Sequence, residues 1–219
     1  MRLDAGSIRA LIESNAHEAA ELAGQLTLLL DRASEDAQCL PAARLVTRRL
    51  ADRLGQALAL ERLARSRAIR PDAWSPLELA EELEHEAVAL AGSRIAIDVH
   101  APDLVPQYWF FDRELVGMAL RNAMHNALMY AAAAVTLELR MQDGYLGFGV
   151  LDDAGAFPAE LLVSRQLPEE RAQCKGNALG VHFARVVAAS HVHGERRGRL
   201  ELANRGSGAG GTRFILWLP

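Results

Sequence analysis

The first seventy residues carry the pattern that most constrains the fold, because apolar residues recur there at helical spacing with little interruption. One apolar stripe runs through residues 11–30 and a second through residues 45–63, and Pro41 is the only proline between residues 5 and 70. Apolar residues three and four apart share one face of an α-helix. The pattern therefore predicts two long helices, joined through residues 34–41 into a helical hairpin.

The apolar stripes of this hairpin also predict its assembly. Two helices with stripes this long cannot bury all of their apolar surface against one another. A second copy of the hairpin, completing a four-helix bundle, is the simplest way to cover the remainder. We therefore expect a homodimer.

A change of composition at residues 70–76, with Pro71 and Pro76, predicts a linker and the start of a second domain. We expect domains at residues 1–70 and 71–219. The second domain shows helical and strand patterns in alternation. Helices are expected at residues 76–92, 112–130 and 177–190, and strands at residues 94–100, 135–141, 145–152, 199–204 and 212–218. Helices on one face of a mixed sheet give an α/β sandwich, so the whole chain is of the α+β class.

Composition excludes several classes of protein. No run approaches the ~20 apolar residues of a membrane helix, and Asp4 and Glu13 do not suit a signal peptide. A net charge of −4 gives no basic excess for nucleic acid. Two cysteines, Cys39 and Cys174, are too few for a disulfide framework or a four-cysteine zinc site. We expect a cytoplasmic protein without nucleic-acid or membrane partners.

Two short patterns in the second domain suggest binding chemistry. Asn122 and Asn126 are four residues apart, so they share one helix face and can direct amide oxygens into a common cleft. The turn at residues 176–180 runs directly into a helix, whose first backbone amides can receive a polyphosphate. The structural alternative for the two asparagines is ordinary hydrogen bonding to nearby backbone.

Four segments together resemble a known family. They are RELVGMALRNAMHNALMYA, GFGVLDDAGAFP, KGNALGVHFARVVAASH and GTRFILWLP. Their order and spacing resemble the ATP-binding domain of sensor histidine kinases, and with the hairpin in front the resemblance covers nearly the whole chain. Each motif by itself would be a weak signal.

The resemblance implies a nucleotide site. It implies that Asn122 and Asn126 hold the phosphates and a magnesium ion, with Asn126 as a metal ligand. Asp152 is similar to the carboxylate that accepts a hydrogen bond from the adenine amino group, and Thr212 would lie beside it. The remaining nucleotide-binding positions that the resemblance implies are Tyr130, Gly155, Gly176 and Gly180.

The chain departs from the family pattern at its glycines. Ala154 and Ala156 stand where the motif after Asp152 has glycine, and Ala178 replaces the middle glycine of the phosphate turn. A Cβ in a left-handed backbone conformation costs on the order of 1–2 kcal/mol and occupies space near a ligand. These substitutions argue against tight binding of ATP and magnesium.

The hairpin carries His17 followed by Glu18, which resembles the histidine–acid pair of the phosphoacceptor helix. A neutral imidazole can attack a phosphoryl group, and a neighbouring carboxylate can orient the ring and take up a proton. Glu21 occupies the place where threonine or asparagine often assists dephosphorylation in the family. The structural alternative is that His17 is a polar residue on a helix surface.

The leading hypothesis is a two-component signalling protein that exchanges a phosphoryl group between His17 and an aspartate of a response-regulator receiver domain. It has two modes. The first is an autokinase that uses magnesium-ATP, and the second is a histidine phosphotransferase whose ATP domain is vestigial. The loss of the glycines favours the second mode. The rival is a non-catalytic pseudokinase that binds a response regulator or another kinase. In each case the signal would come from another protein.

Overall fold

The structure is a computed structural model that describes residues 5–33, 39–66, 69–92, 94–163, 178–205 and 210–219. It divides into two compact units. The hairpin unit consists mainly of residues 3–67, and the sandwich unit consists mainly of residues 68–167 and 180–219.

The hairpin unit contains the two long helices that the apolar stripes predict. They are α1 (Ala5–Ala33) and α2 (Cys39–Ser66). An ion pair joins them, with Arg53 Nε 2.8 Å from Glu18 Oε2. Four leucines of the unit remain at least about half exposed: Leu28, Leu30, Leu54 and Leu58. The helical hairpin is confirmed, and the dimeric bundle stays a prediction. No helix in the described part of the chain is long and apolar enough to cross a membrane.

The sandwich unit holds four helices and nine strands among its described residues. The helices are α3 (Pro76–Ala91), α4 (Arg113–Tyr130), α5 (Ala159–Val163) and α6 (Ala178–Ser190). The strands are β1 (Asp72–Trp74), β2 (Ala96–His100), β3 (Trp109–Phe111), β4 (Ala134–Gln142), β5 (Tyr145–Asp152), β6 (Val192–His193), β7 (Arg196–Arg197), β8 (Arg199–Asn204) and β9 (Thr212–Leu218).

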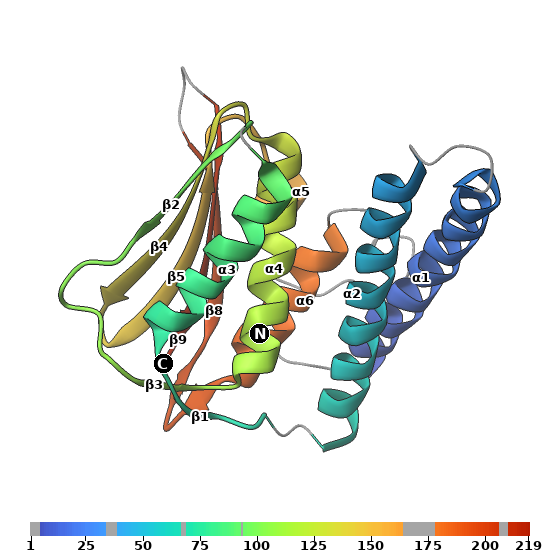
Figure 1. Cartoon of the computed structure of the whole chain (residues 1–219). Helices are drawn as coiled ribbons and strands as arrows, with labels where there is room; N and C mark the ends of the chain where they lie inside the picture. The colour runs from blue at the N-terminus through green and yellow to red at the C-terminus, as the bar shows by residue number, and fades with distance from the viewer. Residues whose placement is uncertain (1–4, 34–38, 67–68, 93, 164–177, 206–209) are drawn as a thin grey trace. The chain divides into compact units, whose positions relative to one another are not determined.

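Five of these strands form one mixed sheet in the order β2-β4-β5-β9-β8. β2 pairs with β4 in parallel, and the other pairs are antiparallel. Figure 1 shows α3, α4 and α6 on one face of this sheet. The core between the layers includes an edge-to-face contact of Phe111 with Phe148, whose ring centroids are 5.6 Å apart. The predicted α/β sandwich is confirmed.

Local sequence signals set the ends of several elements. The Ser75 side chain accepts the Glu78 N–H and caps α3, and Asp112 caps α4 by accepting the Leu115 N–H. Asp143 and Gly144 both have positive φ, 52° and 73°, which is the conformation of a type I′ turn between antiparallel strands. This turn joins β4 to β5.

Other segments differ from the expectation. The predicted linker at residues 70–76 contains β1, which pairs with β3 in a small antiparallel ribbon. A second small ribbon joins β6 to β7, and α5 lies in the polar stretch where the sequence shows no clear period. These elements have only two to five residues each, too few to show a period in the sequence.

Candidate functional sites

The first candidate site lies at the end of β5, around the buried carboxylate of Asp152. Its Oδ1 accepts hydrogen bonds from the backbone N–H groups of Ala154 (3.1 Å), Gly155 (2.7 Å) and Thr212 (3.2 Å). Its Oδ2 accepts the Thr212 hydroxyl. Because β5 and β9 are neighbours in the sheet, the last residue of one meets the first residue of the other. Thr212 therefore lies beside Asp152, as the resemblance implies.

Of the two carboxylate oxygens of Asp152, Oδ2 is the one that can accept a further hydrogen bond. An ionised carboxylate offers about four lone-pair positions. Three backbone donors crowd Oδ1, whereas the Thr212 hydroxyl is the donor that reaches Oδ2 among the described residues. Asp152 can thus accept one further hydrogen bond, for example from an amino group of a ligand.

The turn after Asp152 contains Ala154 and Ala156, the two alanines that replace glycines of the family motif. Gly155 lies between the two alanines, and a Cβ on it would lie 3.1 Å from Asp152 Oδ1, which is a tight contact. Ala154 and Ala156 are exposed, and Asp143 is the only non-glycine residue with positive φ in the described part of the chain. The left-handed strain expected for these two alanines is therefore absent, and that expectation was wrong.

Asn204 holds the end of the same turn through two hydrogen bonds to the backbone of Phe157. Its side chain accepts the Phe157 N–H at 2.7 Å and donates to the Phe157 carbonyl at 3.1 Å. The Gly211 N–H also bonds the Gly155 carbonyl at 3.0 Å. The turn is fixed at several points, so Asp152 is held in position. The sequence gives no sign of the Asn204 contact, which joins residues 47 positions apart.

Asp153, next to Asp152, is a structural residue that sequence reasoning missed. Its carboxylate accepts the backbone N–H groups of Ala132, Ala133 and Ala134 at 2.8–3.0 Å. Partial desolvation acts to raise the pKa of this carboxyl, but the three backbone donors together outweigh it and hold the pKa below its ordinary value. Asp153 thereby fixes the connection from α4 to β4 against the end of β5.

Asn122 and Asn126 lie on one face of α4, as their spacing predicts. Asn126 Nδ2 donates to Asn122 Oδ1 at 3.3 Å, and both side chains are half-buried. The first turn of α6 comes so close that a Cβ on Gly180 would lie 2.1 Å from Asn122 Oδ1. Gly180 is thus the residue type that this approach requires. The two amides and the start of α6 form a cradle that a larger residue at position 180 would fill.

The rest of the predicted nucleotide site is only partly described. Gly176 and Asn177, the first two residues of the predicted phosphate turn, lie outside the described residues. Ala178 begins α6, and Tyr130 is about half exposed at the end of α4. Among the described residues no group of three histidine, cysteine, aspartate or glutamate side chains could hold a metal ion. A magnesium ion would depend on the asparagine oxygens and on ligand phosphates.

Helix α6 carries two buried polar side chains that the sequence did not single out. His182 Nδ1 and Arg185 Nη1 have no hydrogen-bond partner among the described residues, whereas Arg185 Nη2 donates to the Leu161 carbonyl of α5 at 2.6 Å. Burial, together with the charge of Arg185, lowers the pKa of His182 to about 4. His182 is therefore neutral at physiological pH.

His191 is also buried, and both of its ring nitrogens have hydrogen-bond partners. In the structure, His191 Nε2 accepts the Asp112 N–H at 3.0 Å, and Nδ1 donates to the Val187 carbonyl at 2.8 Å. Burial lowers the pKa of His191. Both ring nitrogens are occupied, so His191 joins the end of α6 to the start of α4 and is not available to a metal.

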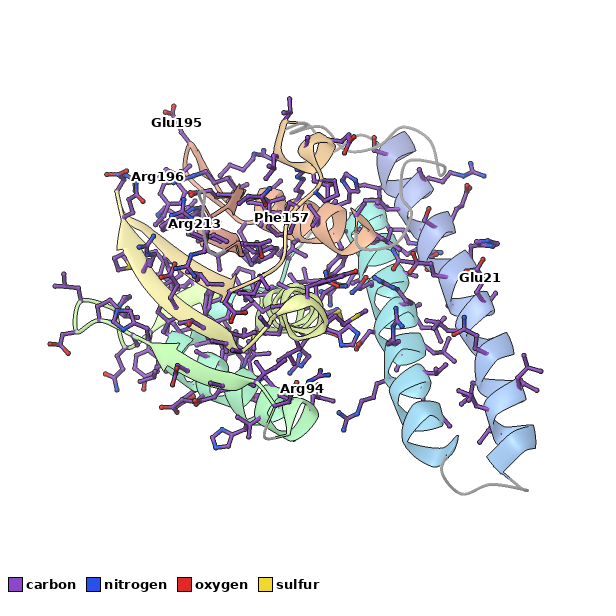
Figure 2. The ribbon with its side chains drawn as sticks, turned by 90° about the horizontal axis from the view of Figure 1, so that it is seen from above. Glu21, Arg94, Phe157, Glu195, Arg196 and Arg213 are labelled. Atoms are coloured by element: carbon purple, nitrogen blue, oxygen red, sulfur yellow. The ribbon has the colours of Figure 1, made fainter. Side chains whose placement is uncertain are left out.

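The second candidate site lies on α1, around His17. The side chain of His17 is about half exposed, and its Nε2 lies 3.1 Å from Glu21 Oε1. Glu18, the residue that the sequence pairs with His17, forms the ion pair with Arg53 of α2 instead. Figure 2 shows Glu21 on the side of α1 turned away from α2. The carboxylate in contact with the ring is therefore that of Glu21, one helical turn further on.

Comparisons with known proteins bear on the fold. No family model matches the chain, and no curated protein matches its sequence. Among solved structures, the histidine kinase AdeS of Acinetobacter baumannii matches 92% of this chain and 96% of its own, with a TM-score of 0.61 and 12% identity. The catalytic domain of histidine kinase ThkA matches 69% of this chain and 96% of its own, with a TM-score of 0.54 and 18% identity.

This chain has the fold of histidine kinases. A third match, full-length ShkA in complex with AMPPNP, covers 95% of this chain and 45% of its own, with a TM-score of 0.61 and 18% identity. The resemblance to sensor histidine kinases seen in the sequence motifs is thus confirmed at the level of the fold.

Proposed function

We propose that the chain is a cytoplasmic two-component signalling protein of histidine-kinase type. It exchanges a phosphoryl group between His17 and an aspartate of a response-regulator receiver domain. The observation that carries the proposal is a half-exposed histidine on a helical hairpin, in a chain whose fold is that of histidine kinases. The protein acts as a homodimer, and the exposed leucines of α1 and α2 supply the apolar surface for that contact.

The chemistry at His17 needs a neutral ring with an accessible nitrogen. In the transfer, the ring nitrogen forms a bond to phosphorus as the P–O bond to the receiver aspartate breaks, and the aspartate leaves as a carboxylate. The reverse reaction uses the same atoms. His17 meets the steric requirement because about half of its side chain is open to solvent. The Glu18–Arg53 ion pair contributes indirectly, because it holds α1 against α2.

The sandwich unit contains the residues that could bind ATP as the source of the phosphoryl group. Asp152 has an acceptor oxygen with spare capacity, and the cradle formed by Asn122, Asn126 and Gly180 offers amide oxygens near a helix N-terminus. These polar groups are of the kinds that contact adenine and magnesium-bound phosphates, and ATP when bound would supply a phosphoryl group. Tyr130, Gly155 and Gly176 complete the proposed set.

We favour the phosphotransferase mode over the autokinase mode. Alanine at positions 154, 156 and 178 adds three methyl groups in turns that surround the proposed nucleotide. The alanines cause no backbone strain at 154 and 156, so their effect on affinity is one of shape alone. Thermal unfolding with millimolar magnesium-ATP separates the modes, because a ligand that binds the folded state raises the unfolding temperature. We expect little or no rise, whereas a rise of several degrees would support the autokinase.

Phosphoryl transfer itself is tested with radiolabelled receiver domains. The full chain is mixed with a panel of phosphorylated receivers, and separately with labelled ATP. We expect label to pass between wild-type protein and at least one receiver, and His17→Ala to carry none. If label reaches neither protein from either source, both transfer modes are wrong and the chain is a binding module.

A further inference from the structure

The contact between His17 and Glu21 has a consequence for the reactivity of the ring. Nε2 is the ring nitrogen furthest from the backbone, so it is the nitrogen that an incoming phosphoryl group reaches most easily. It is also the nitrogen that faces Glu21 Oε1, at 3.1 Å. Glu18, the residue that follows His17, is paired with Arg53, whose Nε lies 2.8 Å from Glu18 Oε2.

The 3.1 Å contact with a carboxylate oxygen favours one form of the neutral ring. A carboxylate can only accept a hydrogen bond, so an oxygen this close favours a proton on Nε2. In the neutral ring the lone pair then lies on Nδ1, and Nε2 cannot attack phosphorus. Attack from Nε2 requires the other tautomer, with its proton on Nδ1, and this tautomer places the Nε2 lone pair against the Glu21 carboxylate unless that contact opens.

Glu21 also opposes the product of the reaction. A phosphoryl group on Nε2 carries close to two negative charges and would lie where the Glu21 carboxylate now lies. Like charges a few ångströms apart repel even in water. Because the side chain of Glu21 is 62% exposed, it can turn into solvent, which moderates the repulsion without removing it.

We propose that Glu21 restrains His17 in both states: it ties up Nε2 in the unphosphorylated protein, and it repels the phosphoryl group after transfer. This proposal rests on the proposed function. Glu21 is a positioning residue in this scheme, and Glu18 is a link between helices. The restraint favours passage of the phosphoryl group onward over storage on His17.

The test uses chemical phosphorylation, which needs no partner protein. Phosphoramidate transfers its phosphoryl group to imidazole: the bond from Nε2 to phosphorus forms, the P–N bond of the donor breaks, and ammonia leaves with the Nδ1 proton. Full-length wild-type protein, Glu21→Gln, His17→Ala and Glu13→Gln are compared. Glu13 is the matched control, because it forms an exposed i,i+4 pair with Arg9 on the same helix.

We expect Glu21→Gln to take up phosphoryl groups about fivefold faster than wild type and to hold them about fivefold longer, which is the effect of roughly one unit charge at ~4 Å in water. Glu13→Gln should stay within twofold of wild type. Equal or slower uptake in Glu21→Gln, or an equal effect of Glu13→Gln, would overturn the proposal.

A second readout separates this proposal from the proposed function. Long-range ¹H–¹⁵N spectra report which nitrogen of His17 carries the proton, without any phosphoryl transfer. We expect the Nε2–H form to dominate in wild type and to lose population in Glu21→Gln. Identical spectra would overturn the role of Glu21 even if receiver domains exchange phosphoryl groups with His17. Conversely, uptake by His17→Ala equal to that of wild type would overturn the proposed function, whatever the spectra show.

Discussion

The hydroxyl of Thr212 is the residue-scale feature that most directly supports the Asp152 carboxylate. Thr212→Val removes this donor and leaves the buried Oδ2 with an unmet hydrogen bond. We expect a loss of about 1–2 kcal/mol in the free energy of unfolding, measured by urea denaturation. Thr212→Ser keeps the hydroxyl and should lose less than half as much. Equal losses for the two variants would mean that the methyl group, and not the hydroxyl, matters here.

Gly180 and Asn122 should show energetic coupling. Gly180→Ala places a Cβ 2.1 Å from Asn122 Oδ1, so the Asn122 side chain must leave its position or the two helices must shift apart. We expect this clash to outweigh the better helix propensity of alanine and to cost about 1–3 kcal/mol.

The partner variant for this clash is Asn122→Ala, which removes the obstacle. In that background Gly180→Ala should cost at least about 1 kcal/mol less, as measured in a double-mutant cycle. Additive effects would contradict the close approach of α6 to Asn122.

At the scale of residues, the sequence predicted contacts that follow from regular geometry. Asp152 and Thr212 end and begin strands, and the family resemblance placed them side by side. The contact of His17 with Glu21 could also have been expected, because residues four apart on a helix are neighbours. The contacts of Asp153 and His191 could not, because they join residues about 20 and 79 positions apart in sequence. Such contacts depend on the packed fold, and no local pattern encodes them.

At the scale of elements, α6 should make stability depend on pH. The pKa of His182 falls from about 6.5 in the unfolded chain to about 4 in the folded one. The unfolded state therefore binds more protons between these values, so stability is full above about pH 6.5 and falls as the pH drops towards 4. A difference of this size corresponds to at most about 3 kcal/mol.

The matched variant for this effect is His182→Gln, which cannot titrate. It should lose less stability than wild type between pH 7 and pH 4.5 in urea unfolding. His191, whose pKa is also lowered, keeps part of the pH dependence in both proteins. His85→Gln, at an exposed position of α3, should behave like wild type. A His182→Gln profile parallel to that of wild type would contradict a buried, neutral His182.

The hairpin gives a second prediction at this scale. The Glu18–Arg53 pair is mostly shielded, with side-chain exposures of 22% and 12%, and it joins α1 to α2. Glu18→Gln removes the carboxylate charge that pairs with Arg53 between the two helices, and we expect a loss of about 1–3 kcal/mol. Glu13→Gln breaks an exposed pair and should cost less than about 0.5 kcal/mol. Hydrogen exchange of α1 amides measures both, and equal protection in the two variants would show that the link between the helices contributes nothing.

Most of the elements that the sequence predicted are longer than those that it missed, although β2, which was predicted, and α5, which was missed, both have five residues. The periodic stripes of α1 and α2, and the strands β4, β5 and β9, extend over seven residues or more. β1 and β3 have three residues each and are held by pairing across the chain. Prolines on both sides of β1 favoured the reading as a linker, although tertiary pairing decides the structure of so short a segment.

At the scale of the whole molecule, the exposed leucines of the hairpin predict a dimer. Light scattering should give a mass near twice the 23.8 kDa of one chain. Replacing Leu54 and Leu58 together by glutamate should yield monomers, because it places charges on the apolar surface. Leu104→Glu, at an exposed leucine of the sandwich unit, should leave the mass unchanged. A wild-type protein that is monomeric at micromolar concentration would contradict the bundle.

The proposed phosphotransfer depends on one residue, because His17 is the histidine that we propose carries the phosphoryl group. The most direct measurement is to incubate the full chain with a phosphorylated receiver domain, quench at alkaline pH, and map the phosphopeptide by mass spectrometry. The account predicts a phosphoryl group on His17 in wild type and none in His17→Ala. A phosphoryl group on another residue, or equal labelling of His17→Ala, would contradict it.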